Sequence, residues 1–171
     1  IVSPSSPETG TIKLIDIRTL RNYRNGEIGF NLENDSSRPY ISDLALASLL
    51  GAMLEVSYDD FSCNGFSHAN GTSAPSVSHI NGINGDLKYL RADGSTQQQL
   101  SLHIDTQPTL LDELRQNKFN DALYKFGWKL FFSYRYTIDG EVRLLNHSQH
   151  LSNHHHHLHL HHYSPNVSII E

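Results

Sequence analysis

Two histidine-bearing segments that lie far apart in the chain carry residue types able to bind a metal ion. The first, residues 78–86, reads Ser-His-Ile-Asn-Gly-Ile-Asn-Gly-Asp, and the second, residues 154–162, contains seven histidines and two leucines. Together they supply two imidazoles and a carboxylate, from His79, Asp86 and His159. A catalytic zinc ion takes three such N or O ligands and keeps a fourth position open for water. The sequence therefore predicts one zinc ion per chain.

The chemistry expected of this ligand set is hydrolysis. Two neutral imidazoles and one carboxylate leave a net positive charge at zinc, so a bound water loses its proton near neutral pH and becomes the nucleophile. A further histidine beside the metal would take a proton from the water, stabilise the developing oxyanion or protonate the leaving amine. His157, two residues before His159, is the predicted catalytic residue.

The late histidine run also predicts its own secondary structure. Histidine and leucine alternate from residue 157 to 161, which is typical of a strand with His157, His159 and His161 on one face and Leu158 and Leu160 on the other. Leucines flank His159 on both sides, whereas another histidine follows His161. The alternative register, with His161 as ligand and His159 as helper, stays open.

The remaining elements must bring these segments together. Residues 1–10 suit an extended lead-in, and residues 11–171 are expected to form one domain. Several elements are expected before the first metal segment. They are a strand-like start at residues 12–16, a loop or short hairpin around Gly26 and Gly29, a helix over 42–54, a short strand over 55–58 and a long surface loop over 59–78. Strands follow over 86–90 and 99–104, separated by a turn over 92–95.

The second half is expected to alternate helix and strand. One or two helices over 109–126 end at Gly127, a strand covers 128–137, and Asp139-Gly140 makes a hairpin turn. The predicted fold is α+β, with a small central antiparallel sheet flanked by helices and zinc in a cleft on one sheet face.

The composition restricts the classes of partner and of site that the chain can have. The chain has 171 residues, 37% of them apolar, a formal net charge of -5 and 13 scattered basic residues, which gives no footprint for nucleic acid. No apolar stretch is long enough to span a bilayer. The single cysteine, Cys63, excludes an internal disulfide and a thiolate-based zinc site. The start at Ile1, without Met, leaves open a removed signal peptide or a larger upstream region.

The two motifs together resemble the LAS group of zinc peptidases, which includes D-alanyl-D-alanine carboxypeptidases, penicillin-insensitive murein endopeptidases, lysostaphin-type enzymes and the hedgehog amino-terminal domain. In that pattern a His is followed by a Gly three residues on and an Asp seven residues on, here His79, Gly82 and Asp86. Asn84 replaces the more usual alanine. The resemblance implies that the later His of His-x-His, here His159, binds zinc and that His157 assists catalysis.

The resemblance further implies a substrate and a location. Carboxypeptidase relatives often carry an Arg after the first strand to hold the substrate's terminal carboxylate, but residues 56–61 contain none, which favours an endopeptidase. The implied partner is a peptidoglycan peptide, in the periplasm or outside the cell; an immunity or inhibitor protein stays open. Ser78, Tyr58 and Tyr163 are the expected substrate-binding residues, with ordinary packing as the alternative.

Three other functions remain open from the sequence. One is a D,D-carboxypeptidase acting on a terminal D-Ala. Another is a binding module that keeps zinc without catalysis, as hedgehog domains do. The third is a histidine-rich metal buffer, which would leave the first motif without a role.

Overall fold

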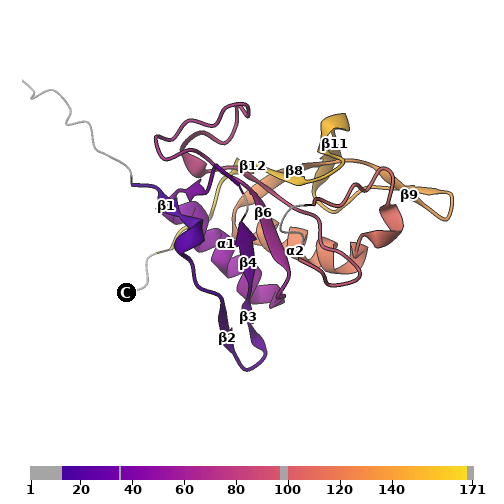
Figure 1. Cartoon of the computed structure of the whole chain (residues 1–171), viewed down its shortest axis with the longest axis horizontal. Helices are drawn as coiled ribbons and strands as arrows, with labels where there is room; N and C mark the ends of the chain where they lie inside the picture. Colours follow the sequence, from indigo (N-terminus) through magenta and orange to yellow (C-terminus); the bar gives the residue numbers. More distant parts are fainter. Residues whose placement is uncertain (1–12, 35, 97–99, 169–171) are drawn as a thin grey trace, which may run out of the picture.

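The chain is built around a six-stranded mixed sheet. The computed structural model describes residues 13–34, 36–96 and 100–168 (Figure 1). The strand order across the sheet is β11 (Ser148–His150), β8 (Trp128–Ser133), β12 (Leu158–Tyr163), β7 (Gly85–Leu87), β6 (Phe61–Gly65) and β4 (Leu32–Asn34). The four inner strands pair antiparallel, whereas each edge strand, β11 and β4, is parallel to its neighbour.

The α+β class is thus confirmed, but the prediction of a small antiparallel sheet is wrong. Parallel neighbours need a crossover connection, commonly a helix. Between β4 and β6 that connection contains helix α1 (Asp43–Val56), and between β8 and β11 it contains the hairpin of β9 (Tyr136–Ile138) and β10 (Glu141–Arg143). Both crossovers add a parallel strand at an edge.

The two long helices follow the predicted ranges closely. At the start of α1 the Ser42 hydroxyl accepts a hydrogen bond from the backbone N–H of Ala45 at 3.3 Å. Helix α2 (Glu113–Phe126) begins with the Asp112 carboxylate accepting from Arg115 N–H at 3.1 Å and ends at Gly127. A short 3-10 turn, η3 (Pro108–Leu110), precedes it. The helix predictions over 42–54 and 109–126 are therefore confirmed.

Two-stranded ribbons complete the described part of the fold. β1 (Ile15–Asp16) pairs with β5 (Tyr40–Ile41), and β2 (Tyr23–Asn25) forms a hairpin with β3 (Ile28–Phe30). The hairpins predicted near Gly26 and at Asp139-Gly140 are both present. Short 3-10 turns lie at η1 (Ile17–Thr19), η2 (Ile80–Gly82) and η4 (Ser152–His154). The predicted lead-in, residues 1–10, lies outside the described residues.

Several strand predictions are wrong. Residues 55 and 56 finish α1, and Ser57 ends it in a left-handed conformation, so no strand forms over 55–58. The predicted surface loop over 59–78 instead contains β6, an interior strand of the sheet. The described residues 100–104 are not a strand, although Leu102 and Ile104 are fully buried. The single strand predicted over 128–137 is interrupted between β8 and β9.

The apolar core lies between the sheet and the helices, which are drawn behind the strands in Figure 1. Leu158 and Leu160 of β12 are fully buried in the same cluster as Leu49 of α1 and Leu123 of α2. The histidines that alternate with these leucines therefore point to the opposite face of the sheet. Among the described residues, no helix is long and apolar enough to cross a membrane.

Candidate metal centre

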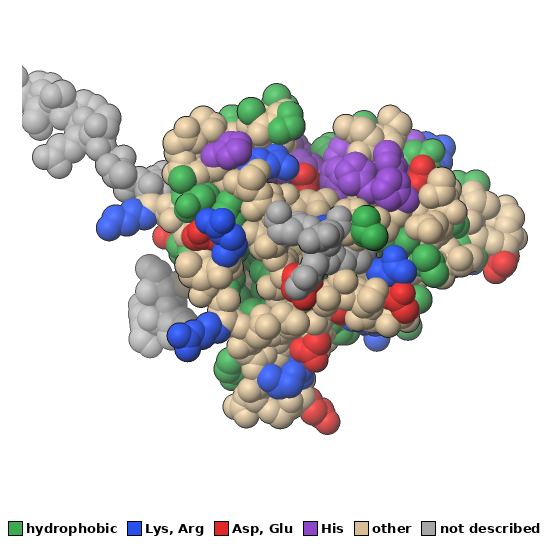
Figure 2. Space-filling view, in the orientation of Figure 1, with side chains coloured by type: hydrophobic (Ala, Val, Ile, Leu, Met, Phe, Trp, Pro, Cys, Tyr) green, Lys and Arg blue, Asp and Glu red, His purple; other side chains and the backbone are tan. Residues whose placement is uncertain are grey.

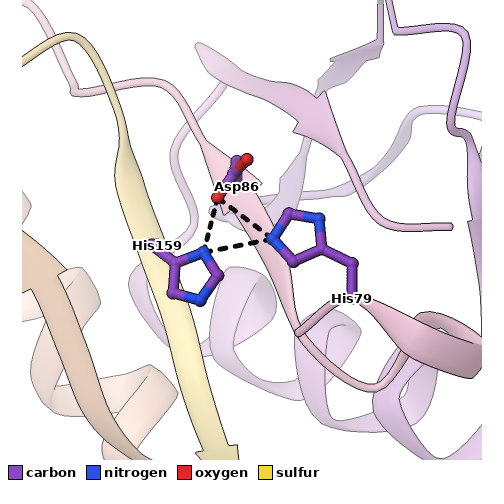
Figure 3. Close-up of side chains that lie close together, drawn as sticks. All are labelled: His79, Asp86 and His159. Carbon is purple, nitrogen blue, oxygen red and sulfur yellow. Dashed lines mark hydrogen bonds and ion pairs between the residues drawn. The ribbon is translucent and has the colours of Figure 1, made fainter. Parts of the chain in front are cut away.

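The two predicted metal segments meet on the face of the sheet that carries the histidines. Nε2 of His79, Oδ1 of Asp86 and Nδ1 of His159 point toward one another (Figure 3). The two imidazole nitrogens are 3.1 Å apart, and Asp86 Oδ1 is 3.3 Å from His79 Nε2 and 2.8 Å from His159 Nδ1. All three residues are buried. This group can bind a metal ion.

Adjacent strands place two of the three ligands. His159 in β12 is directly opposite Asp86 in β7 in the antiparallel register, so their side chains leave the sheet on the same face. The neighbouring register pairs are Leu158 with Leu87 and Leu160 with Gly85. The structure therefore places His159, and not His161, opposite Asp86.

His79 approaches from the loop that precedes β7. Its ring Nδ1 donates a hydrogen bond to the backbone carbonyl of Phe66 at 3.1 Å, and its side chain is fully buried. Because a carbonyl only accepts, this bond fixes the proton on Nδ1 and leaves the Nε2 lone pair directed at Asp86 and His159. The backbone thus holds His79 in a tautomer suited to metal binding.

A glycine lets this loop come close to the strand before α1. Gly82 has φ +63, and a Cβ there would lie 2.6 Å from the Cα of Ile41 and 2.5 Å from the carbonyl oxygen of Tyr40. Its own carbonyl accepts a hydrogen bond from Ser42 N–H at 3.2 Å. Only glycine combines this conformation with such a close contact. The Gly of the sequence motif therefore sets the path of the chain between His79 and Asp86.

Asp86 is ionised in this environment. Burial by itself would raise the pKa of the carboxyl, but its contacts with His159, His79 and His157 hold the pKa well below its usual range. Arg38 adds a positive charge, with Nη2 3.9 Å from Asp86 Oδ2. The carboxylate is therefore available as a negatively charged ligand at neutral pH.

His157 lies at the edge of this group. Its Nε2 is 3.6 Å from Asp86 Oδ1, and its Nδ1 is buried without a hydrogen-bond partner. Burial lowers the pKa of His157 to about 3, with repulsion from His154 and His156 contributing and Asp86 opposing. The imidazole is therefore neutral at pH 7 and can accept a proton. Residue 157 precedes β12 but shares the face of His159, as predicted.

A second buried imidazole borders the first. The ring of His154 packs against that of His157, with 4.6 Å between ring centroids, and its Nδ1 is 2.7 Å from the side-chain oxygen of Asn153. Burial lowers the pKa of His154 to about 4, and repulsion from His159 acts in the same direction. Two neutral imidazoles thus lie beside the group of His79, Asp86 and His159.

These residues line a solvent-open pocket of about 550 Å³. Figure 2 shows a large patch of histidine side chains on the upper right of the molecule, with a smaller one apart from it on the upper left. The lining combines the polar and charged side chains of the centre with apolar ones at its rim: Arg38, Ser76, Ser78, Asp86, Asn153, His154, His157, His159 and His161, with Pro75, Val77, Phe132 and Leu151. The prediction of a cleft on one sheet face matches this pocket.

Arg38 is the pocket residue that sequence reasoning missed. It lies in the segment before α1, where Nη1 donates to the carbonyl of Ser73 at 3.3 Å and the side chain is largely buried. The family resemblance places a substrate-binding arginine only in the region of residues 56–61. No local pattern around Arg38 signals its position, because the contact with Asp86 depends on how the loop over 66–79 folds back.

Two of the three expected substrate-binding residues lie elsewhere. Tyr58 packs against Phe61 and under the guanidinium of Arg115, 4.3 Å from the ring centroid. Tyr163 shares a hydrogen bond of 2.7 Å with the Ser48 hydroxyl, which ties β12 to α1. Both tyrosines serve packing, the alternative noted from the sequence, and neither lines the pocket. Ser78 does line the pocket, with its hydroxyl 3.1 Å from Nε2 of His159.

A second group of histidines lies next to the pocket. The rings of His103, His155 and His156 have centroids 4.8 to 5.7 Å apart. Within the described part of the chain, however, only His79, Asp86 and His159 bring three ligand atoms within 4.8 Å of one another. The tract therefore contains one preformed centre and not a series of equivalent sites.

The buried neutral histidines predict that the metal-free protein loses stability in mild acid. The folded-state pKa of His157, about 3, lies below the ordinary value of 6.5. Between these values the unfolded chain binds a proton that the folded chain does not, so falling pH favours unfolding. Each such histidine contributes a slope approaching about 1.4 kcal/mol per pH unit.

Urea unfolding in the presence of a chelator, followed from about pH 7 to about pH 5, measures this slope. His157→Asn should reduce the slope by close to one proton, and His162→Asn, a change at an exposed position, should leave it as in the wild type. Equal slopes for wild type and His157→Asn would contradict the assignment of His157 as a neutral imidazole.

Comparison of the chain with protein-family models, with curated proteins and with solved structures finds no match in any of the three.

Proposed function

We propose that the chain is a zinc metallopeptidase of the LAS type that cleaves a peptide bond in peptidoglycan, acting in the periplasm or outside the cell, where that substrate lies. The observation that carries the proposal is the meeting of His79, Asp86 and His159 beside the neutral imidazole of His157 in an open pocket. A ligand group, a proton acceptor and access for substrate occur together there.

Zinc suits this ligand set. Zinc binds imidazole nitrogen and carboxylate oxygen at about 2.0–2.2 Å, so neighbouring ligand atoms of a tetrahedral site lie about 3.3 Å apart. The separations of 2.8 to 3.3 Å among the three atoms are close to that value. Three protein ligands facing a solvent-open pocket also fit a catalytic site better than a closed structural one. When bound, zinc would polarise the scissile carbonyl and lower the pKa of a water molecule.

The other pocket residues supply the remaining roles. His157 is neutral and next to Asp86, so it can take a proton from the attacking water and then pass that proton to the leaving amine. The ring of Phe132 stacks on His159 with centroids 5.7 Å apart and keeps one side of the ligand dry.

The pocket lining supports a partly apolar substrate that carries a negative charge. Pro75, Val77 and Leu151 form an exposed apolar rim around the polar floor. Arg38 places a cation at the pocket, and Asp86 is the single carboxylate among the described lining residues. A murein stem peptide combines an extended backbone with small apolar side chains and carboxylates, and so matches this lining.

Arg38 also favours a second candidate function. The sequence argued against a carboxypeptidase because residues 56–61 lack an arginine, but the guanidinium of Arg38 reaches the pocket from another segment. It lies where it could pair with the terminal carboxylate of a substrate. A D,D-carboxypeptidase that removes a terminal D-Ala is therefore the alternative to an endopeptidase.

Mass spectrometry of muropeptides tests the proposal and separates the two activities. Purified peptidoglycan of several wall types is incubated with zinc-loaded protein and with protein held in chelator. Conversion of cross-linked muropeptides to uncross-linked ones indicates an endopeptidase, whereas loss of one terminal alanine indicates a carboxypeptidase. If the zinc-loaded protein leaves every wall type and cross-link intact, the peptidase proposal fails and a zinc-retaining binding module becomes the better assignment.

A further inference from the structure

We infer that Ser78 and Asn84 are positioning residues for the metal ligand His159: Asn84 holds the backbone of Ser78, and the Ser78 hydroxyl fixes the orientation and tautomer of the His159 ring. This inference rests on the metal centre of the proposed function and is independent of the bond that is cleaved.

The first observation is that the two ring nitrogens of His159 have different partners. Nδ1 faces Asp86 and His79, whereas Nε2 lies 3.1 Å from the Ser78 hydroxyl. The residue is only 6% exposed, so water contributes little to the hydrogen bonding of the ring. A metal-binding imidazole commonly donates its other N–H to a neighbouring acceptor, which sets the tautomer. Ser78 is in the position to be that acceptor.

The second observation concerns Asn84. Its side-chain amide donates a hydrogen bond at 2.9 Å to the backbone carbonyl of Ser78, six residues earlier in the chain. The Asn84 residue is only 6% exposed. This is the position at which the resembling zinc peptidases usually carry alanine, and alanine has no donor for the Ser78 carbonyl. The departure from that pattern therefore has a structural role in this chain.

A serine hydroxyl can serve His159 both with and without a metal. In the metal-free centre, the Nδ1 proton of His159 is directed at Asp86 Oδ1, 2.8 Å away, and the Ser78 hydroxyl donates to Nε2. With a cation at Nδ1, the ring proton is on Nε2 and the same hydroxyl accepts it. Ser76, whose hydroxyl is 3.3 Å from that of Ser78, can then accept the serine proton.

Zinc affinity and the His159 tautomer test the inference. Competition with a chromophoric chelator should show a 10- to 100-fold weaker affinity in Ser78→Ala, the usual effect of losing the hydrogen-bond partner of a ligand. Ser78→Thr, which keeps the hydroxyl, should restore the affinity. Asn84→Ala should weaken binding in the same direction, while Ser152→Ala, at an exposed serine just outside the pocket, should bind as wild type.

Nitrogen-15 NMR of the histidine rings gives the second readout. The zinc-loaded wild type should show His159 with its proton on Nε2, and Ser78→Ala should broaden or shift that resonance without changing the fold seen by circular dichroism. Wild-type affinity in both Ser78→Ala and Asn84→Ala, or a threonine variant no better than alanine, would overturn the inference. A wild-type chain that binds no zinc overturns both proposals, whereas one that binds zinc but cleaves nothing overturns only the peptidase.

Discussion

Replacement of Asp86 by Asn is expected to weaken zinc binding by more than about 100-fold, beyond the range found when only an outer hydrogen-bond partner of a ligand is lost. The amide has nearly the shape of the carboxylate but no negative charge, and the pKa of Asp86, held well below its usual range, shows how strongly the surrounding groups favour the charged form. Peptidoglycan cleavage should be lost together with the metal.

Asp105→Asn is the matched control for this substitution. It makes the same chemical change at an exposed aspartate that does not line the pocket. Asp105 lies two residues after His103, a histidine of the second group next to the pocket. Isothermal titration with zinc on both variants and the wild type measures affinity and stoichiometry. We expect one tight zinc per chain in the wild type and in Asp105→Asn.

The same titration tests whether the chain is instead a histidine-rich metal buffer. A buffer would bind several weak equivalents through the run over 154–162 and would be almost unchanged by the loss of Asp86. The preformed geometry of a single group, with ligand atoms from two distant segments, predicts the opposite result. Binding of Asp86→Asn within a few-fold of the wild type, with a stoichiometry above one, would exclude the metal centre described above.

Replacement of His157 by Ala is expected to reduce cleavage by about 10²- to 10⁴-fold while zinc remains bound. The imidazole lies 3.6 Å from Asp86 Oδ1 but outside the group of three ligand atoms, so its loss removes a proton acceptor and not a ligand. Turnover of a cross-linked muropeptide, measured with the zinc content of the same sample, tests both parts of this prediction.

His155→Ala provides the comparison within the histidine run. The Nδ1 of His155 donates to the carbonyl of Ser152, and the residue does not line the pocket, so cleavage by this variant should match the wild type. Loss of zinc in His157→Ala would show that His157 is a fourth ligand. Unchanged cleavage in His157→Ala would assign the proton transfer to another group, of which the neighbouring His154 is the nearest buried imidazole.

The group of His79, Asp86 and His159 could be predicted from sequence because its signal is local. The residue types, the spacing from His79 to Asp86 and the alternation around His159 can all be read directly from the sequence. A strand of alternating side chains also has only two faces, so residues two apart must share one of them. The helices were predictable for a similar reason, since Ser42 and Asp112 cap them and Gly127 ends the second one.

The remaining features depend on contacts between distant segments. The strand β6 reads Phe-Ser-Cys-Asn-Gly, a composition that favours a loop, yet it lies between β4 and β7 with both faces covered. Arg38 reaches the pocket only because the loop over 66–79 folds over it. The mixed sheet likewise depends on how the connections from β4 to β6 and from β8 to β11 bring the second strand back beside the first. The periodicity within one segment does not encode such a contact.

The histidine–leucine repeat of β12 is short, and it limits how the strand can pair. A slip of two residues that brought His161 opposite Asp86 would put Leu160 at the buried position of Leu158 but His162 at that of Leu160, so only one of the two leucines would stay in the core. The distinguishing contacts lie at the end of the strand, where Tyr163 bonds to Ser48 and Ser164 N–H bonds to the carbonyl of Gly127 at 2.7 Å. The contacts at the aromatic end of β12 therefore help to fix the pairing register, and with it the histidine that lies opposite Asp86.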